Sequence, residues 1–327
     1  MATETASSFC TFGNLRLYPV VASDAFIATH KNVSGYSTLK ESLESKKVVV
    51  SERASGISAT GAANSNISRP PNPRPILQGN QANPNVEMLQ SARGGEQVNS
   101  LFVENFSKDT VFIMAGEVVK GGKQDRVLAQ DMILPPNSGK VDIGVFCVEH
   151  GRWTYGAENG DGSFAGYGNT SSKTVRAAAI VGKEQSKVWA EVSDITTKNG
   201  AQSATGTYNE LEKNESFQKN MNAYLEFFNS LPLKDYKIIG MVGVSGDKII
   251  GADLFATPEL FRNQYKTLLQ SYCTEAITNG KPVAISDKKV QEYFDQFFAN
   301  ESKQEESVTG KGMIFKKDEV KLHITTF

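Results

Sequence analysis

The chain lacks the features that mark membrane proteins and disulfide-stabilised proteins. None of its apolar runs approaches the ~20 residues that a helix needs to cross a bilayer. Only three of its 327 residues are cysteines, and Cys10, Cys147 and Cys273 lie far apart. An odd and sparse set of this kind is not a disulfide framework. We therefore expect a globular protein without a transmembrane segment, and the hydrophobic fraction of 39% is enough for a substantial core.

The chain also lacks a surplus of charge of either sign. Its 35 basic and 36 acidic residues give a net charge of −1, and no basic cluster is interleaved with aromatic residues. This composition argues against nucleic acid or a membrane surface as the main partner. No protein partner is identified by the sequence.

Histidine is scarce as well, which limits the chemistry that the chain can carry. His30, His150 and His323 are widely separated, so the short His and Cys spacings of a zinc site are absent. The G-x-S-x-G turn of many serine hydrolases is also absent. The sequence therefore predicts no metal site and identifies no cofactor.

The N-terminal stretch MATETASSFC has neither the basic n-region nor the apolar h-region of a signal peptide. Two interpretations stay open: a cytoplasmic protein, or an exported protein whose signal peptide has been removed. The localisation is therefore not predicted.

Apolar periodicity divides the chain into two kinds of region. Alternating apolar residues before about residue 168 predict a mainly antiparallel β domain (1–168), interrupted by a Pro/Asn-rich loop insertion at 54–95. Helical periodicity and a hairpin signal predict an α+β half at 169–280, and a helix and β-hairpin tail at 281–327. The predicted fold class is α+β, with the β-rich N-terminal half packed against the α+β half.

Four local predictions follow from capping and turn residues. A short helix at 36–43 has Thr38 and Glu41 in a capping-box pattern. The strands at 99–106 and 109–115 are expected to form a hairpin. The polar segment ESKQEES is expected to be a linker, and the last residues are expected to form a hairpin that turns at Lys317-Asp318.

The insertion at 54–95 differs from the rest of the chain in composition. Residues 53–86 contain neither Asp nor Glu, and prolines alternate there with Asn, Ser, Gly and Arg. Such a segment buries little apolar surface. It is either a lid or partner-binding arm, as long loops often are, or a tolerated surface insertion.

Two glutamates end two of the predicted strands. Alternate residues from Val111 to Ala115 are apolar before Glu117, and alternate residues from Val141 to Cys147 are apolar before Glu149. Alternate residues of a strand share a face, so each carboxylate follows an apolar face. A buried carboxylate is unfavourable unless it is paired or hydrogen-bonded.

Basic partners for both glutamates are close in sequence. A two-residue turn at Gly121-Gly122 places Glu117 opposite Arg126, and Arg152 follows Glu149 closely. We expect these four side chains to converge on one pocket. The alternative is two structural ion pairs that lock loops. His150 is a weaker candidate base, because on strand alternation it faces away from Glu149.

The motifs GEVVKGGKQDRVL and CVEHGRW together resemble an uncharacterised bacterial family, the ADP-ribosylglycohydrolase- and rhodanese-phosphatase-associated domain. The chain keeps these residues of the family pattern: Gly116, Glu117, Gly121, Lys123, Gln124, Arg126, Cys147, Glu149, Gly151, Arg152 and Trp153. It departs from the pattern at Val118, where a second glutamate is usual, and at Asp125, where asparagine is usual.

Weaker similarities to the same family extend from Tyr36 to about Ala276, and the C-terminal tail lies beyond them. They include SATG at 203–206, GADLF at 251–255 and LLQSY at 268–272. The resemblance implies no settled activity. The family name points to nucleotide or ADP-ribose metabolism through genomic association alone.

Two functions from different classes remain. The first is a small-molecule enzyme, plausibly a hydrolase, that acts on a phosphate-, nucleotide- or ADP-ribose-like substrate, with glutamate as general acid or base and cations that hold anionic oxygens. Its catalytic residues are predicted to be Glu117 and Glu149, and its substrate-binding residues Lys123, Gln124, Arg126, Arg152 and Trp153. The second is a non-catalytic binding or scaffold module in which the Glu/Arg pairs are structural. The sequence does not decide whether the protein is an enzyme.

Overall fold

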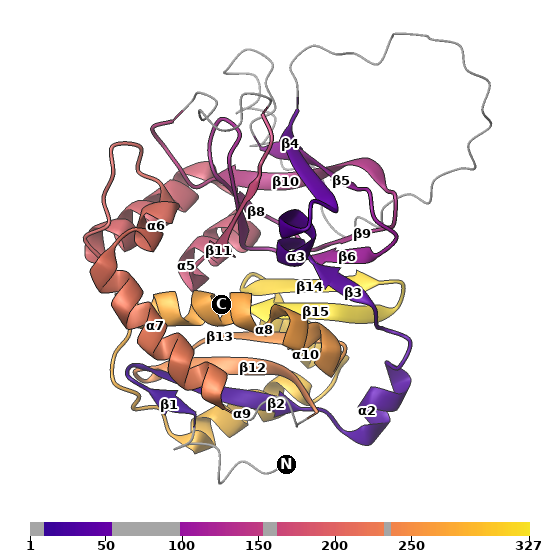
Figure 1. Cartoon of the computed structure of the whole chain (residues 1–327). Helices are drawn as coiled ribbons and strands as arrows, with labels where there is room; N and C mark the ends of the chain where they lie inside the picture. The colour runs from indigo at the N-terminus through magenta and orange to yellow at the C-terminus, as the bar shows by residue number, and fades with distance from the viewer. Residues whose placement is uncertain (1–9, 54–98, 153–161, 232–236) are drawn as a thin grey trace, which may run out of the picture.

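The computed structural model describes residues 10–53, 99–152, 162–231 and 237–327. Within these ranges the chain is α+β, as the sequence predicts, and its strands form three sheets with mostly antiparallel pairing. The two six-stranded sheets lie one above the other in Figure 1, with helices beside and between them. The predicted loop insertion at 54–95 lies outside the described residues.

The first six-stranded sheet joins the two ends of the chain. Its strands, in spatial order, are β1 Thr11–Phe12, β2 Leu15–Val21, β12 Ile238–Ser245, β13 Lys248–Phe255, β15 Val320–Thr326 and β14 Gly312–Lys317. All residues of β12 are buried, because other layers cover both faces of this sheet. The partition at 168 and 281 stays a prediction, and this one sheet takes strands from all three predicted regions.

The second six-stranded sheet curls back on itself. Its strands, in spatial order, are β11 Gly166–Thr170, β7 Glu117–Lys120, β8 Arg126–Leu128, β10 Gly139–Cys147, β5 Ser100–Asn105 and β4 Val48–Glu52. The edge strand β4 bridges to Ser163 through Ser51, and Phe164 N donates to Val50 O at 2.8 Å. Residues 162–170 therefore join both edges of the sheet, which leaves little edge open to other strands.

The third sheet is small and consists of β3 Tyr36–Thr38, β6 Thr110–Ile113 and β9 Met132–Leu134. Helix α3, Leu39–Glu44, follows β3 directly. The side chain of Thr38 accepts from Glu41 N, and the Glu41 carboxylate accepts from Thr38 N, which confirms the predicted capping box.

The predicted hairpin between 99–106 and 109–115 is wrong. Strand β5 pairs with β4 and β10, whereas β6 pairs with β3 and β9 in another sheet. The side chain of Asn105 explains the change of sheet, because its Nδ2 donates to Asp109 O at 2.7 Å and to Pro135 O at 3.0 Å. These bonds fix the chain in an irregular turn where a hairpin would continue one ladder.

The helices are α2 Asp24–Thr29, α5 Lys173–Ala177, α6 Gln185–Lys198, α7 Glu215–Ser230, α8 Pro258–Thr278, α9 Asp287–Phe298 and α10 Glu301–Val308, with a π-helical turn η1 Ala178–Gly182 and a 3₁₀ turn η2 Tyr208–Glu212. The polar segment ESKQEES is α10, not a linker, because Asn300 caps it through Lys303 N. The terminal hairpin is confirmed as β14 and β15, with β15 hydrogen-bonded to β13 inside the first sheet.

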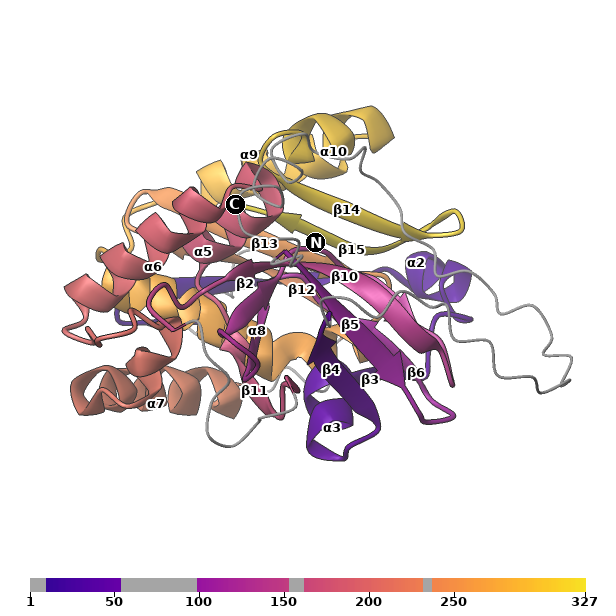
Figure 2. The same ribbon diagram turned by 90° about the horizontal axis from the view of Figure 1, so that it is seen from above.

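The first sheet separates two apolar clusters, and alternation along β2 shows this directly. Leu17 packs in the cluster shared with β6, α7 and α8, whereas Tyr18 packs in the cluster beneath α9 and α10. Figure 2 shows α9 and α10 on one side of this sheet, and α8 and the second sheet on the other. A third cluster, which includes Val50, Val103 and Phe164, belongs to the second sheet.

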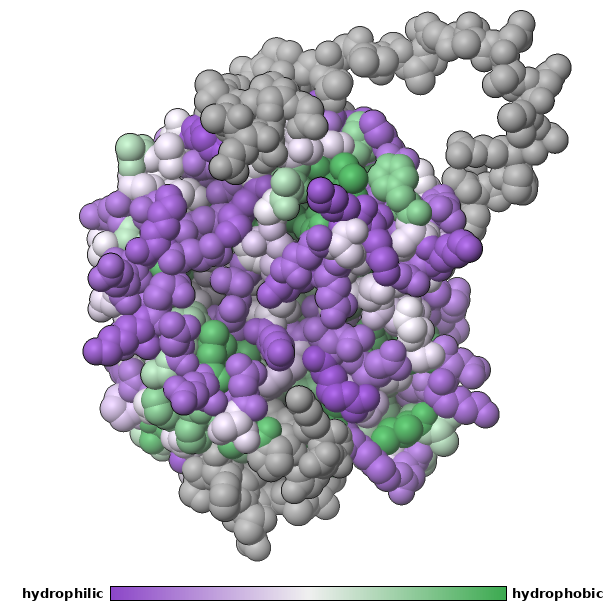
Figure 3. Space-filling model, viewed as in Figure 1, coloured by the Kyte–Doolittle hydropathy of each residue, from purple (hydrophilic) through white to green (hydrophobic). Residues whose placement is uncertain are grey.

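The surface in Figure 3 is mainly hydrophilic. Among the described residues, the large apolar side chains that are exposed are Val21, Val49, Phe106 and Phe298. A functional site is therefore expected among the polar residues, in the pockets that they line.

Candidate functional site

The connection between β7 and β8 is organised by Asp125. Its Oδ1 accepts from Gly121 N at 3.0 Å, which closes residues 121–125 into a loop. Its Oδ2 accepts from Thr207 Oγ1 at 3.2 Å and from Asn209 Nδ2 at 2.7 Å. One carboxylate therefore ties this loop to a segment some eighty residues later in the chain.

Glu149 and Arg152 form the ion pair that the sequence predicts. Arg152 Nε lies 2.9 Å and Nη2 lies 2.7 Å from Glu149 Oε2. The same oxygen accepts from Asp125 N at 3.2 Å. Arg152 also donates to Gly122 O at 2.8 Å and to Asp125 Oδ1 at 3.2 Å. These bonds fix the Glu149 carboxylate and the guanidinium against the 121–125 loop.

Residues 203–207 complete this part of the molecule. Gly151 N donates to Thr205 O at 2.8 Å, and Glu149 forms an isolated bridge with Thr207. A Cβ atom on Gly151 would lie 3.0 Å from Thr205 Cα, so the close approach of the two segments favours glycine. The SATG similarity at 203–206 thus lies directly beside the CVEHGRW similarity.

These groups surround a pocket of about 580 Å³. Its walls include Lys120, Asp125, Glu149, Arg152, Thr207 and Asn209. Glu149 is only 4% exposed, and Oε2 carries its hydrogen bonds. Its other oxygen, Oε1, has no hydrogen-bond partner among the described residues. We call this space the Glu149 pocket.

Arg126 does not pair with Glu117, so the predicted cross-strand bridge is wrong. The ladder places Arg126 opposite Val119, two residues away from the predicted register. Arg126 is fully buried and donates to Gln124 O at 2.6 Å and to Glu52 Oε1 at 3.4 Å. The register differs because Asp125 draws five residues into the loop, where we expected a two-residue turn.

Glu117 belongs to a separate environment. It is fully buried, and its Oε2 accepts from Met114 N at 2.8 Å while its Oε1 accepts from Tyr167 OH at 2.7 Å. Burial raises the pKa of Glu117 to about 7, and Asp131 adds to the rise while both hydrogen bonds oppose it. Glu117 is not among the residues that line the Glu149 pocket.

The remaining predicted site residues that the structure describes do not line this pocket. Lys123 donates through its backbone N to Glu52 Oε1 at 3.0 Å. Gln124 is buried, and its Nε2 donates to His150 O at 3.3 Å. Trp153 lies outside the described residues. Of the predicted residues that the structure describes, it therefore brings only Glu149 and Arg152 to the pocket.

A second charged cluster was not predicted from the sequence. His323 on β15 lies between two carboxylates, with Nδ1 at 2.6 Å from Asp131 Oδ2 and Nε2 at 3.2 Å from Asp253 Oδ1. Because both ring nitrogens face carboxylate oxygens, the imidazole is set to donate from both and to be protonated. Burial alone lowers the pKa of His323, but Asp131 and Asp253 raise it to about 9.

Arg176 on α5 completes this buried charge cluster. It contacts both oxygens of Asp253, at 2.7 Å and 3.2 Å, and Tyr272 OH donates to Asp253 Oδ2 at 2.6 Å. Burial alone raises the pKa of Asp253, but Arg176 and His323 hold it well below its usual range. Gly116 leaves room for this arrangement, because a Cβ there would lie 2.6 Å from Arg176 Cγ.

Two signals in the sequence pointed toward this cluster. Asp253 and Tyr272 lie within the GADLF and LLQSY similarities, where an acidic residue on an apolar strand needs a partner. Nothing local identifies the partners, because His323 and Asp131 are 192 residues apart. Asp125 was noticed only as a departure from the family pattern.

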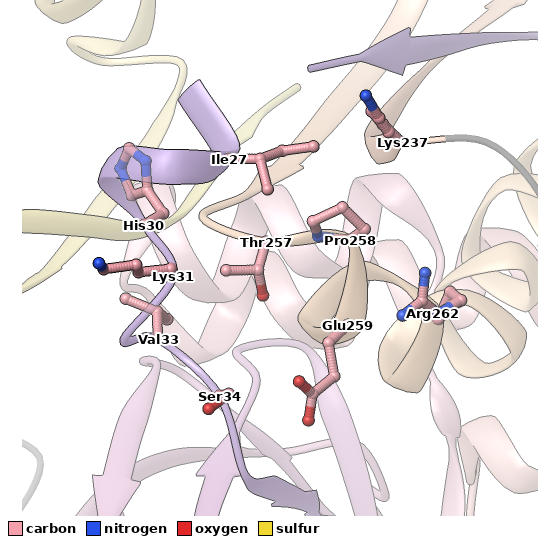
Figure 4. Close-up of a pocket in the computed structure, with 10 residues that line it drawn as sticks. All are labelled: Ile27, His30, Lys31, Val33, Ser34, Lys237, Thr257, Pro258, Glu259 and Arg262. Carbon is pink, nitrogen blue, oxygen red and sulfur yellow. The ribbon is translucent and has the colours of Figure 1, made fainter. Parts of the chain in front are cut away.

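Another pocket, of about 390 Å³, lies near the start of α8 (Figure 4). The cations Lys31, Lys237 and Arg262 line it, but Figure 4 shows them apart and pointing in different directions. Lys237 is already paired with Asp24. This pocket does not gather its charges around one point, as the Glu149 pocket does.

In the described ranges, no group of three or more His, Cys, Asp or Glu residues is placed to hold a metal ion. None of the helices in those ranges is both long and apolar enough to cross a membrane. No curated protein and no solved structure matches the chain. One family does match, over residues 4–325, so the match also includes most of the tail that we had placed beyond it. The chain belongs to the family described as the ARG and Rhodanese-Phosphatase-superfamily-associated Protein domain.

Proposed function

We propose that the Glu149 pocket binds a small polar molecule that carries both hydroxyl and anionic groups, as sugar phosphates and nucleotides do. The observation that supports this most strongly is the Glu149 carboxylate itself. It is almost buried and held on one oxygen by Arg152, while its other oxygen has no partner among the described residues. Oε1 is not among the buried atoms that lack a partner, so it is accessible from the pocket, where a ligand hydroxyl can donate to it.

The wall formed by residues 203–209 suits a hydroxyl-rich ligand. It presents Ser203, Thr205, Thr207 and Asn209, whose neutral side chains both donate and accept hydrogen bonds. Thr207 and Asn209 are already oriented by Asp125. Preorganised polar groups of this kind lower the cost of ordering the site when a ligand binds.

The Glu149 pocket also offers two lysines, Lys120 and Lys213, to an anionic group of the ligand. Lys120 is paired with Glu212 at 2.6 Å, and Lys213 is paired with Glu210 at 3.1 Å. The Lys213 side chain is 72% exposed, and ion pairs at such positions contribute only about 0–1 kcal/mol. Lys213 can therefore exchange its carboxylate for a phosphate at little cost.

The catalytic form of this proposal rests on Glu149 alone. A carboxylate fixed on one oxygen and open on the other can accept a proton from a ligand hydroxyl or from an attacking water. Hydrolysis of a phosphate-bearing substrate is the reaction class that uses such a base. Glu117 has no part in it, because it is sealed and outside the pocket.

The scaffold function is the second candidate, and one observation favours it. Asp125 accepts from Gly121 N, and Glu52 accepts from Lys123 N and from Arg126. Arg126 also donates to Gln124 O, so these three charged side chains are satisfied within the fold. Such a network rigidifies a surface even if nothing small binds to it.

A thermal-shift screen separates the two. Wild-type protein and Glu149→Gln are heated with ADP-ribose, AMP, ribose 5-phosphate and divalent metal ions. A ligand at about 100 times its Kd stabilises the folded state by about 2.7 kcal/mol, which is a rise of several degrees in Tm. We expect a rise for at least one phosphate-bearing ligand with wild type and a much smaller one with Glu149→Gln. The absence of any rise in either protein contradicts the binding function and favours the scaffold.

A further inference from the structure

A second pocket, of about 520 Å³, lies on the other side of residues 203–206. It shares Ser203 with the Glu149 pocket, and Gly206 also lines it. Gly206 N donates to Ser203 O at 3.2 Å and Thr207 N to Ser203 Oγ at 3.4 Å, so a single turn of chain separates the two spaces. The two pockets are therefore neighbours on either side of this turn.

The chemistry of this second pocket differs from that of its neighbour. Among the described residues, no Asp, Glu, Lys or Arg lines it, whereas seven of the residues that line the Glu149 pocket belong to these types. Two aromatic rings line it instead: Trp189 on α6 and His150, with ring centroids 4.5 Å apart at an angle of 76°. Apolar ring surface without charge favours a flat, neutral ring as the occupant.

The indole of Trp189 carries a second, independent indication. Its Nε1 is buried and has no hydrogen-bond partner among the described residues. Buried indole N–H groups are nearly always paired, so this unpaired donor sets Trp189 apart from an ordinary core tryptophan in the described part of the chain. The amide of Gln202 adds a further polar group, because only its Nε2 is engaged, with Thr197 Oγ1 at 3.1 Å.

Adjacent residues serve the two pockets. Glu149 lines one pocket and His150 the other, as expected of neighbours on an extended segment whose side chains point to opposite sides. The CVEHGRW motif thus contributes a carboxylate to the charged pocket and a ring to the neutral one. His150, which does not line the Glu149 pocket, thus has a place in the neighbouring one.

We propose that the ligand of this protein is a nucleoside phosphate, with its heteroaromatic base held by Trp189 and His150 and its sugar phosphate in the Glu149 pocket. This rests on the proposed binding function and specifies its ligand. The base packs against the two rings. Stacking of a base on an aromatic side chain typically strengthens binding by about tenfold to hundredfold.

The test compares two ligands that differ only by the base. The full chain is titrated calorimetrically with ribose 5-phosphate and with AMP. We expect AMP to bind about ten to a hundred times more tightly. Trp189→Ala should remove most of that advantage without changing the affinity for ribose 5-phosphate, while Trp189→Phe should keep much of it.

His150→Ala supplies a second variant at an exposed position outside α6. It should also reduce the advantage of AMP. Lys213→Met is the matched control, since it should weaken both ligands equally and leave their ratio unchanged.

The outcomes are distinguishable. Equal affinities for the two ligands, or a ratio that survives Trp189→Ala and His150→Ala, overturn the base-binding inference while the sugar-phosphate function stands. Tighter binding of ribose 5-phosphate than of AMP also overturns it. If neither ligand binds, the proposed function and this inference fail together.

Discussion

The molecule contains two clusters of paired charges that differ in what surrounds them. In the buried cluster, the side chains of Asp131, Asp253, Arg176 and His323 are at most 2% exposed, and they bring together the neighbouring strands β13 and β15, helix α5 and the residue before β9. In the Glu149 pocket, the side chain of Arg152 is 21% exposed and the carboxylates face an open space of about 580 Å³. Pairing alone therefore does not identify a functional site, because both clusters are paired and only one is open.

The two glutamates make the same point. Glu117 and Glu149 follow similar apolar alternation in the sequence, yet β7 begins at Glu117 whereas β10 ends at Cys147, two residues before Glu149. Glu117 is therefore inside a ladder and sealed, whereas Glu149 lies in the connection that leaves the sheet. The position of a carboxylate relative to the strand end decided its environment.

The largest expected effect is in the buried cluster. Asp253→Asn leaves Arg176 and His323 without their shared counter-charge, so the free energy of unfolding should fall by about 3–5 kcal/mol. Urea denaturation at pH 7 measures this. Asp142→Asn is the control, because its ion pair with Arg53 is on the surface and is expected to contribute at most about 1 kcal/mol. If Asp253→Asn and Asp142→Asn lowered the free energy of unfolding by the same small amount, the buried and the exposed ion pairs would not differ in the way described.

The next effect is a dependence on pH that His323 carries. Because its folded-state pKa of about 9 lies above the ordinary 6.5, its contribution is fully present below pH 6.5 and is lost as the pH rises through 9. The expected loss is on the order of 3 kcal/mol. Unfolding measured from pH 6 to pH 9.5 tests this, and His323→Gln should flatten that range. A wild-type stability that is constant there contradicts a protonated His323.

A separate dependence on pH belongs to Glu117. Its pKa of about 7 also lies above the ordinary value, 4.5, so its contribution is present below pH 4.5 and is lost as the pH rises through 7. Glu117→Gln mimics the neutral carboxyl. It should be more stable than wild type above pH 7, by about 2–3 kcal/mol, and equal to it near pH 4. If Glu117→Gln were less stable than wild type at every pH, the Glu117 carboxylate would have to be charged and fully hydrogen-bonded in the wild-type protein.

The smallest effect on stability is expected in the open pocket. Glu149→Gln keeps an acceptor for Asp125 N and leaves Arg152 paired with Asp125, so we expect a loss of only about 1 kcal/mol. Denaturation under the conditions used for Asp253→Asn measures it. A loss as large as that of Asp253→Asn would make the Glu149–Arg152 pair structural.

Much of the fold was predictable because its signals are local. The capping box of Thr38 and Glu41 and the terminal hairpin that turns at Lys317-Asp318 each depend on residues close together in the chain. The errors occurred where a side chain acts over a longer distance. Asp125 changed the β7–β8 register, and Asn105 sent β5 and β6 into different sheets.

The site was predictable to the same extent. Glu149 and Arg152 are three residues apart, so their pairing could be read from the sequence. The contribution of residues 203–209 required the fold, because Asp125 meets Asn209 across 84 residues. The buried cluster required it still more, since His323 comes from a hairpin that sequence analysis had treated as an added tail.

The central claim is that the two glutamates have different roles, and one measurement compares them directly. Wild type, Glu149→Gln and Glu117→Gln are titrated with AMP by calorimetry at pH 7.5, with each variant's folding verified by circular dichroism. We predict that Glu149→Gln lowers the affinity by at least about tenfold, the scale of one lost charged hydrogen bond, while Glu117→Gln binds as wild type does. Equal losses in both variants, or a loss in Glu117→Gln alone, would contradict the account.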